Sequence, residues 1–176
     1  MNKTYQTELR RLFLLQELPE PLTRASEHLQ IFDNYIENTR LRLRSVRVPQ
    51  TKEWTWILQQ RFPLEENKLT SWRTSEIYLN EAEYNFFQPF EGREIRKNRY
   101  FYEFGERQIR IDVFLGELWG LNLAMVNFET EEELKIFEIP SFSIAEVTNN
   151  PFFKGENLVT KNFADVQNEF ARMTNT

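Results

Sequence analysis

Three arginines occupy every second position of the segment 40–44. Arg40, Arg42 and Arg44 alternate with Leu41 and Leu43. Neighbouring side chains of a β-strand point to opposite faces, so the arginines share one face and the leucines take the other. Such a strand is either an exposed edge protected by charge or an anion-binding surface, for which guanidinium groups are suited because they bind two phosphate oxygens at once.

Two other segments repeat this spacing. Lys97 and Arg99 share one face of a strand over residues 95–100, and Glu8 and Arg10 share one face of a strand over residues 8–15. This repetition favours the anion-binding surface over a protected edge.

Alternating apolar residues, turns and caps predict mostly strands. Asn80 with Glu83, and Thr130 with Glu133, have the spacing of capping boxes that begin helices over 81–87 and 131–137, and a third helix is expected over 163–173. The expected strands cover 8–15, 31–36, 39–48, 54–62, 70–78, 94–104, 107–115, 121–128 and 144–148, with 31–36 and 39–48 forming two strands or one interrupted strand.

About eight strands in hairpin order, with helices at the turns, predict an α+β, mainly β fold. We expect one domain over residues 1–176, with a core over about 5–160. It would be an eight-stranded antiparallel closed barrel with short peripheral helices and a C-terminal helix.

Composition limits the function. The 176 residues are 40% apolar and 15% aromatic, enough for one sizeable core, and the net charge of −5 argues against a nucleic-acid binder. A positive site must therefore be local and enclosed. The absence of Cys and the single His28 exclude thiolate nucleophiles and a multi-His metal site. No apolar run reaches a membrane span and no signal peptide is evident, so we expect a cytoplasmic protein that does not contact membranes.

Five segments in order resemble the CYTH, or triphosphate tunnel metalloenzyme, family. They are Glu8-Leu-Arg-Arg-Leu-Phe-Leu-Leu15, Asp33-Asn-Tyr-Ile-Glu-Asn-Thr-Arg-Leu-Arg-Leu-Arg44, Arg96-Lys-Asn-Arg-Tyr100, Ile111-Asp-Val-Phe-Leu-Gly-Glu-Leu-Trp-Gly-Leu121 and Ala145-Glu-Val-Thr148. The resemblance implies a barrel whose basic lumen holds a triphosphate while glutamates hold Mg²⁺ or Mn²⁺.

The chain departs from that family at the metal ligands. The family's first-strand pattern Glu-x-Glu-x-Lys falls on Glu8, Arg10 and Leu12, and its late Glu-x-Glu pattern falls on Met125 and Asn127. We therefore interpret the chain as a degenerate member that has lost most metal-binding carboxylates and kept its anion site, with Arg10 supplying charge that a metal supplies elsewhere.

Seven predicted basic residues and three predicted acids give the lumen a net charge of +4. Asp112 and Glu146 could instead be ordinary salt-bridge partners, and Arg61, which replaces a lysine of the family, would point outward if its strand slipped by one residue. The predicted ligand-binding residues are Arg10, Arg40, Arg42, Arg44, Arg61, Lys97 and Arg99, and the inward acids, which would hold a metal if one were bound, are Glu8, Asp112 and Glu146.

Two hypotheses of function follow. The first is a binding module without a cofactor, a pseudoenzyme that holds tripolyphosphate, a nucleotide or another polyanion, or that uses its barrel as a scaffold for a protein partner. The second is an active inorganic triphosphatase, nucleotide phosphohydrolase or adenylate-cyclase-like enzyme that uses Mg²⁺ or Mn²⁺.

Overall fold

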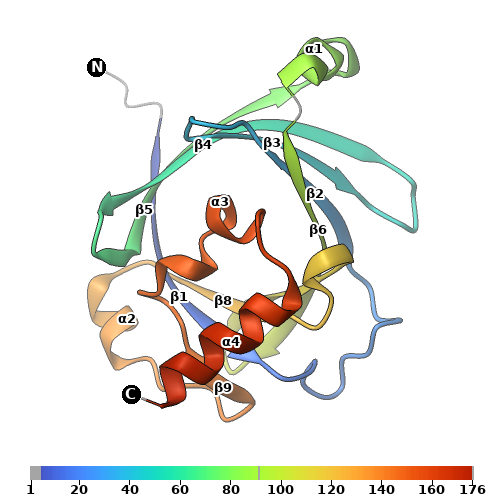
Figure 1. Ribbon diagram of the computed structural model, residues 1–176. Coiled ribbons are helices and arrows are strands. Elements are labelled where there is room, and N and C mark those ends of the chain that lie inside the picture. Colours follow the sequence, from blue (N-terminus) through green and yellow to red (C-terminus); the bar gives the residue numbers. More distant parts are fainter. Residues whose placement is uncertain (1–4, 91, 176) are drawn as a thin grey trace.

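A computed structural model describes residues 5–90 and 92–175. In this part of the chain nine strands form one antiparallel sheet in the order β5-β4-β3-β2-β6-β7-β8-β1-β9, and pairing of β5 with β1 closes eight of them into a barrel (Figure 1). The strands are β1 (Gln6–Leu15), β2 (Leu29–Tyr35), β3 (Leu41–Arg47), β4 (Trp54–Glu65), β5 (Lys68–Leu79), β6 (Arg93–Phe104), β7 (Arg107–Phe114), β8 (Asn122–Phe128) and β9 (Ser143–Glu146).

Strand β1 closes the barrel because it is long enough to have three partners. Its first half pairs with β5, with Gln6 opposite Thr74, and residues from Leu9 onward pair with β8. Beyond the β5 contact, β9 pairs with the second half of β1 and stays outside the closed barrel. The predicted eight-stranded antiparallel barrel is confirmed.

The strand order differs from a simple succession of hairpins. Strand β2 pairs with β3 and β6, while β1 pairs with β5 and β8, so the connections from β1 to β2 and from β5 to β6 do not join neighbouring strands. The alternation of apolar residues specifies the face of each strand but not its partner. Segments 31–36 and 39–48, which the sequence left open, form β2 and β3 around a turn in which Asn38 has a left-handed φ of 59°.

The predicted helices are present, with one difference in capping. Helix α1 (Glu81–Phe86) has the complete capping box of Asn80 and Glu83. At α2 (Glu131–Ile136) the Thr130 side chain accepts from the Glu133 N–H as expected, but the Glu133 carboxylate accepts from the Glu129 N–H, one residue before the cap. The C-terminal helix is α4 (Phe163–Thr174).

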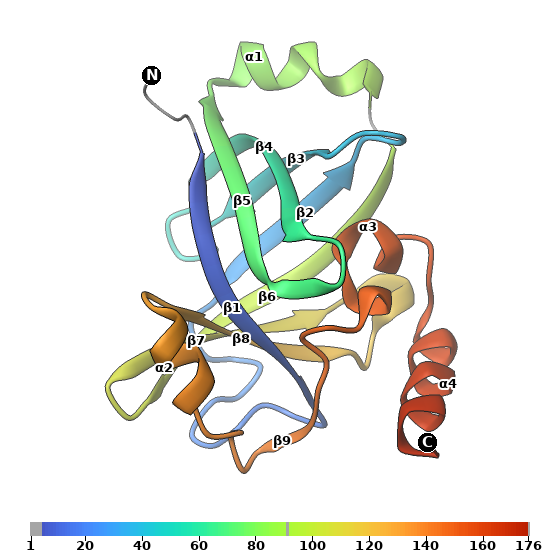
Figure 2. The same cartoon turned by 90° about the vertical axis from the view of Figure 1, so that its left-hand side faces the viewer.

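Short helices that were not predicted from the sequence lie between β9 and α4. They are the 3₁₀ turn η3 (Pro151–Phe153) and α3 (Gly155–Leu158); further 3₁₀ turns are η1 (Gln88–Phe90) and η2 (Gly116–Leu118). We call residues 149–158 the plug, because α3 lies over one open end of the barrel, beside α4 (Figures 1 and 2). Position 155 requires glycine because a Cβ there would clash with the Tyr35 hydroxyl.

Two apolar clusters lie on opposite faces of the barrel strands. One includes Leu12, Phe114 and Leu123 and packs against the plug and α4, and the other includes Phe13 and Ile109 and packs against α2 and the segment before β2. Leu12 and Phe13 are neighbours on β1, so the two faces of this strand serve different clusters. In the described residues no helix combines the length and apolar character that crossing a membrane requires.

Candidate anion-binding site

The lumen contains two adjoining compartments. The plug-side compartment has a volume of about 350 Å³ and the far compartment about 60 Å³. Successive inward residues of a strand line one compartment and then the other, as Arg10 and then Glu8 do on β1, and Asp112 and then Arg110 on β7. This order shows that the two compartments are stacked along one barrel axis.

One side of the lumen, formed by β2, β3, β6 and β7, carries an ion-pair network. We define this network as Asp33, Arg44, Lys97, Arg99 and Asp112, all of them buried. The Arg44 guanidinium donates to both Asp33 oxygens at 2.6 and 2.7 Å, and Arg99 donates to both Asp112 oxygens at 2.7 and 2.8 Å. Lys97 lies between them, with its Nζ 2.8 Å from Asp112 and 3.7 Å from Asp33.

The network keeps its carboxylates ionised. Burial by itself would raise the pKa of Asp33, but Arg44 and Arg42 hold this pKa far below its ordinary value; Arg99 and Lys97 do the same for Asp112. Burial lowers the pKa of Lys97 to about 8, against the opposing effect of the two carboxylates. Each buried charge of the network thus has a partner of opposite sign.

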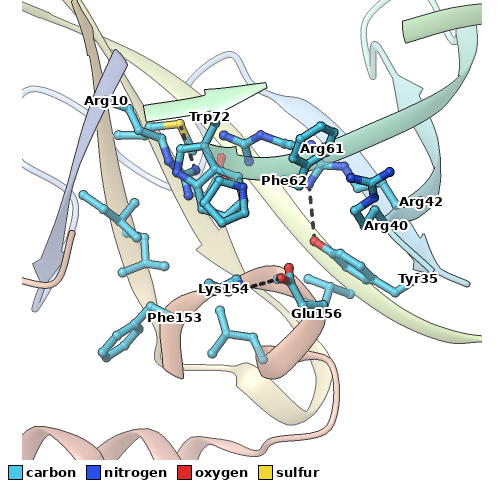
Figure 3. A pocket seen from close by; sticks show the side chains of 18 of the residues that line it. Arg10, Tyr35, Arg40, Arg42, Arg61, Phe62, Trp72, Phe153, Lys154 and Glu156 are labelled. Atoms are coloured by element: carbon cyan, nitrogen blue, oxygen red, sulfur yellow. Dashed lines mark hydrogen bonds and ion pairs between the residues drawn. The ribbon is translucent and has the colours of Figure 1, made fainter. Parts of the chain in front are cut away.

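The other side of the lumen, formed by β1, β4 and β5, carries the arginine stack, which we define as Arg10, Arg61 and Trp72. The Cζ atoms of Arg10 and Arg61 lie 4.2 and 4.7 Å from the centre of the Trp72 ring (Figure 3). Trp72 is only 2% exposed, and its indole N–H donates to the Leu69 carbonyl at 2.7 Å. The ring is therefore fixed and presents its π-system to the two cations.

The two guanidinium groups of the stack are incompletely bonded. Arg61 donates to Glu8 at 2.8 Å and Arg10 makes a long contact of 3.8 Å to the Met125 sulfur. In the described part of the chain, the buried Nε atoms of both arginines have no hydrogen-bond partner. Burial, and then the neighbouring Arg61, lower the pKa of Arg10 well below its ordinary value; burial also lowers the pKa of Arg61. An anion between them would relieve this cost.

The predicted basic residues converge in the lumen with one exception. Arg42 is buried, donates to the side-chain Oε1 of Gln59 at 2.5 Å and to the Tyr35 hydroxyl at 3.3 Å, and lies 3.6 Å from Asp33. Arg40 precedes β3 and is exposed, with its Cζ 4.1 Å from the Phe62 ring centre at the rim of the plug-side compartment. The basic residues in the lumen are therefore Arg10, Arg42, Arg44, Arg61, Lys97 and Arg99.

Two of the three predicted acids face the lumen. Arg61 lowers the pKa of Glu8 against the effect of burial, and Asp112 belongs to the ion-pair network. The expectation that Glu146 faces inward is wrong. Glu146 stands opposite Phe13, on the outer face of β1, where its two carboxylate oxygens accept hydrogen bonds from Arg11 at 2.7 and 2.8 Å. Directly opposite residues of paired strands point the same way, which determines its side.

Several inward groups were not predicted from the sequence. The sequence could have indicated Arg110, because it lies two residues from Asp112 and so shares its face of the strand. Arg110 donates to the Asn127 side chain at 2.7 Å, and burial lowers its pKa to about 10. No sequence pattern indicated Asp33, because the sequence does not show that this residue stands opposite Arg44. With these two, and with Glu76 at the far compartment, the described strand residues that face the lumen comprise seven cations and four carboxylates, a net of +3 instead of the predicted +4.

The carboxylates of the lumen do not form a metal site. Glu8, Asp33 and Asp112 are each held by a cation, and Arg10 and Met125 lie on the wall beside them. Within the described ranges, no group of three or more His, Cys, Asp or Glu side chains is placed to hold a metal. These donors therefore do not fit Mg²⁺ or Mn²⁺, which need several free oxygen ligands.

Comparison with known proteins identifies the fold. No family model matches the chain, and no curated protein matches its sequence. A structure of the inorganic triphosphatase NE1496 matches with 24% identity and a TM-score of 0.58, over 86% of this chain and 93% of that one. Another structure, described as the hypothetical protein NE1496, matches with 23% identity and a TM-score of 0.59, over 88% of this chain and 99% of that one. The chain has the barrel fold of NE1496, in agreement with the resemblance to the CYTH family.

Proposed function

We propose that the protein binds a phosphate polyanion, such as tripolyphosphate, in the plug-side compartment, at the arginine stack. The observation that carries this proposal is the pair of buried guanidinium groups whose Nε atoms lack partners and which line one cavity. A buried cation without a full set of hydrogen bonds costs stability, and a phosphate that binds both groups would recover that cost.

Other cations extend the site. Arg42 and Lys97 line the same compartment, and the plug adds Lys154, whose Nζ lies 6.0 Å from the Trp72 ring centre and 2.8 Å from Glu156 (Figure 3). A chain with a net charge of −5 thus concentrates positive charge in an enclosed place. Attraction of a polyanion into such a cavity is strong because little water screens it.

Binding at this site needs no metal, and hydrolysis is impaired. Arg10 stands where the family pattern has a carboxylate, and its guanidinium would neutralise phosphate oxygens directly. Phosphoryl transfer relies on metal-based neutralisation of the reacting phosphate, and the loss of such contacts commonly slows a reaction about a thousandfold or more. We therefore expect turnover of tripolyphosphate, with Mg²⁺ or Mn²⁺, well below about one per second.

Triphosphate hydrolysis is the second candidate, because NE1496 is described as an inorganic triphosphatase. Measured release of phosphate from tripolyphosphate distinguishes the two candidates. Metal-dependent turnover near one per second would replace the binding module with the enzyme. A protein partner and a cytoplasmic location stay predictions.

Titration calorimetry with tripolyphosphate, with and without EDTA, tests the proposal. We expect the same affinity in both conditions, and about tenfold or more weaker binding by Arg10→Met, because a charge-assisted contact is lost. Arg73→Met is the matched control: Arg73 follows Trp72 on β5 but points to the opposite face, and its Cζ lies 4.2 Å from the Tyr5 ring centre. Absence of binding at millimolar ligand, or equal affinity of the two variants, would overturn the proposal.

A further inference from the structure

The plug-side compartment has two unlike walls, and this difference bears on which polyanion it takes. One wall is basic and includes the arginine stack and Arg42. The other is apolar and lies toward the plug. It consists of Leu12, Ile95, Phe114 and Leu123, which adjoin Arg10, Lys97, Asp112 and Met125 on the inward faces of β1, β6, β7 and β8, and of Phe153 and Leu158 of the plug. The inference below rests on the proposed function, since it concerns the ligand of the same site.

The apolar wall is unsuited to an inorganic polyphosphate. Tripolyphosphate carries charge on every phosphate group, so any part of it that lies against Leu12 or Leu123 would lose water without gaining a hydrogen bond. Leu12 stands at the position where the family pattern has a lysine, so the chain has replaced a charge by an apolar side chain at this point of the lumen. The wall would gain from contact with an apolar group of the ligand.

An aromatic base is also a poor match. The Trp72 ring already has Arg10 and Arg61 over it at 4.2 and 4.7 Å and is only 2% exposed, so little of the indole is accessible for stacking. Any polar edge of a base that lay against the apolar wall would meet no hydrogen-bond donors or acceptors there. An aliphatic group has no such unsatisfied atoms.

The volume limits the size of that group. About 350 Å³ is near the lower end of the range for small-molecule pockets, and the phosphates must occupy the part beside the arginines. We infer that the natural ligand is an organic diphosphate or phosphate ester with a compact aliphatic group, whose phosphates bind the arginine stack while its alkyl part contacts Leu12, Leu123 and Leu158.

Calorimetry with pyrophosphate, methyl diphosphate, isopentenyl diphosphate and geranyl diphosphate tests this inference in the unmodified protein. Affinity should rise by roughly fourfold for each buried methylene, so isopentenyl diphosphate should bind at least tenfold more tightly than pyrophosphate. Geranyl diphosphate should gain nothing further, because its chain exceeds the space beside the plug.

Leu12→Ala and Leu14→Ala form a matched pair of variants. Both leucines are on the same face of β1 in the same buried cluster, but only Leu12 lines the compartment. Leu12→Ala should weaken binding of isopentenyl diphosphate and, by enlarging the compartment, favour the longer geranyl chain, whereas Leu14→Ala should leave the order of affinities unchanged.

The outcomes separate this inference from the proposed function. If tripolyphosphate binds and isopentenyl diphosphate binds no more tightly than pyrophosphate, the inference is overturned and the proposed function stands. If no phosphate compound binds at millimolar concentration, both fail. A steady gain from methyl to isopentenyl diphosphate, lost in Leu12→Ala, supports the inference even if Leu14→Ala lowers the melting temperature.

Discussion

Asp33 on β2 and Trp72 on β5 both meet pairs of arginines in the lumen, but they treat the charges differently. Asp33 gives Arg44 two short hydrogen bonds and has Arg42 and Lys97 within 4 Å. Trp72 offers Arg10 and Arg61 only the face of its ring. A carboxylate neutralises a cation, whereas a ring holds it in place and leaves its hydrogen bonds free.

These two surroundings give different roles to cations that the sequence does not distinguish. The ion-pair network is closed, since its guanidinium and carboxylate groups bind each other. The arginine stack is more open: Arg61 is paired with Glu8, but both arginines line a cavity of about 350 Å³ and their buried Nε atoms have no hydrogen-bond partner among the described residues. The network should therefore matter most for stability, and the stack for binding.

Replacement of Asp33 by asparagine should have the largest effect. It leaves Arg44 buried without a counter-charge, and removal of one partner of a buried ion pair costs about 3–5 kcal/mol in the free energy of unfolding. Urea denaturation measures this loss. Glu94→Gln is the control, because it removes the exposed ion pair with Arg96 at 2.8 Å and should cost less than about 1 kcal/mol. Equal losses of unfolding free energy in the two variants would show that the ion-pair network contributes no more to stability than an exposed ion pair.

Arg44→Met and Arg10→Met compare the two sides directly. Arg44→Met leaves Asp33 without its main partner and should destabilise the fold by about 3 kcal/mol or more. Arg10→Met orphans no carboxylate and removes a cation whose pKa burial already lowers, so its unfolding free energy should change by less than about 1 kcal/mol. A comparable loss in both variants, measured by urea denaturation, would mean that the stack is structural.

Acid should destabilise the fold through the same carboxylates. The pKa values of Asp33 and Asp112 lie far below their ordinary value of 3.8 in the folded chain. As the pH falls below about 4, the unfolded chain takes up protons there and the folded chain does not, so the free energy of unfolding decreases. Urea denaturation at several pH values should show a shallower decrease for Asp112→Asn. An unchanged slope in that variant would contradict this assignment.

The smallest effect concerns the pH dependence of binding. The pKa of Lys97 is about 8, and this residue lines both compartments. Deprotonation between pH 7 and 9 removes a positive charge from the lumen, so tripolyphosphate affinity should decrease severalfold as the pH rises. Lys97→Arg keeps its charge across this range, and calorimetry should show a flatter profile for it. If the affinity of Lys97→Arg decreased with the same pH midpoint, the titration would belong to another group.

Much of the lumen follows from local patterns. Arg42, Arg44, Lys97 and Arg99 were expected inside because their alternation places them on one face of a strand, and the structure buries all four. Arg110 lies in the same alternation and could have been found in this way. The plug also had a signal, because Asn150 caps the turn that begins at Pro151, but a turn does not indicate the barrel end over which it lies.

The remaining features depended on which strands become neighbours. The sequence alone determined that β-rich segments alternate apolar and charged faces, since the twofold period of a strand is a property of the backbone. Only the tertiary structure decided that Asp33 stands opposite Arg44 and that Glu146 lies outside, on Arg11. Only it placed the Trp72 ring beneath Arg10. The register between strands that are far apart in the chain determines which charged side chains lie opposite each other. It therefore determines whether an arginine is neutralised by a carboxylate or keeps hydrogen-bond donors for a ligand.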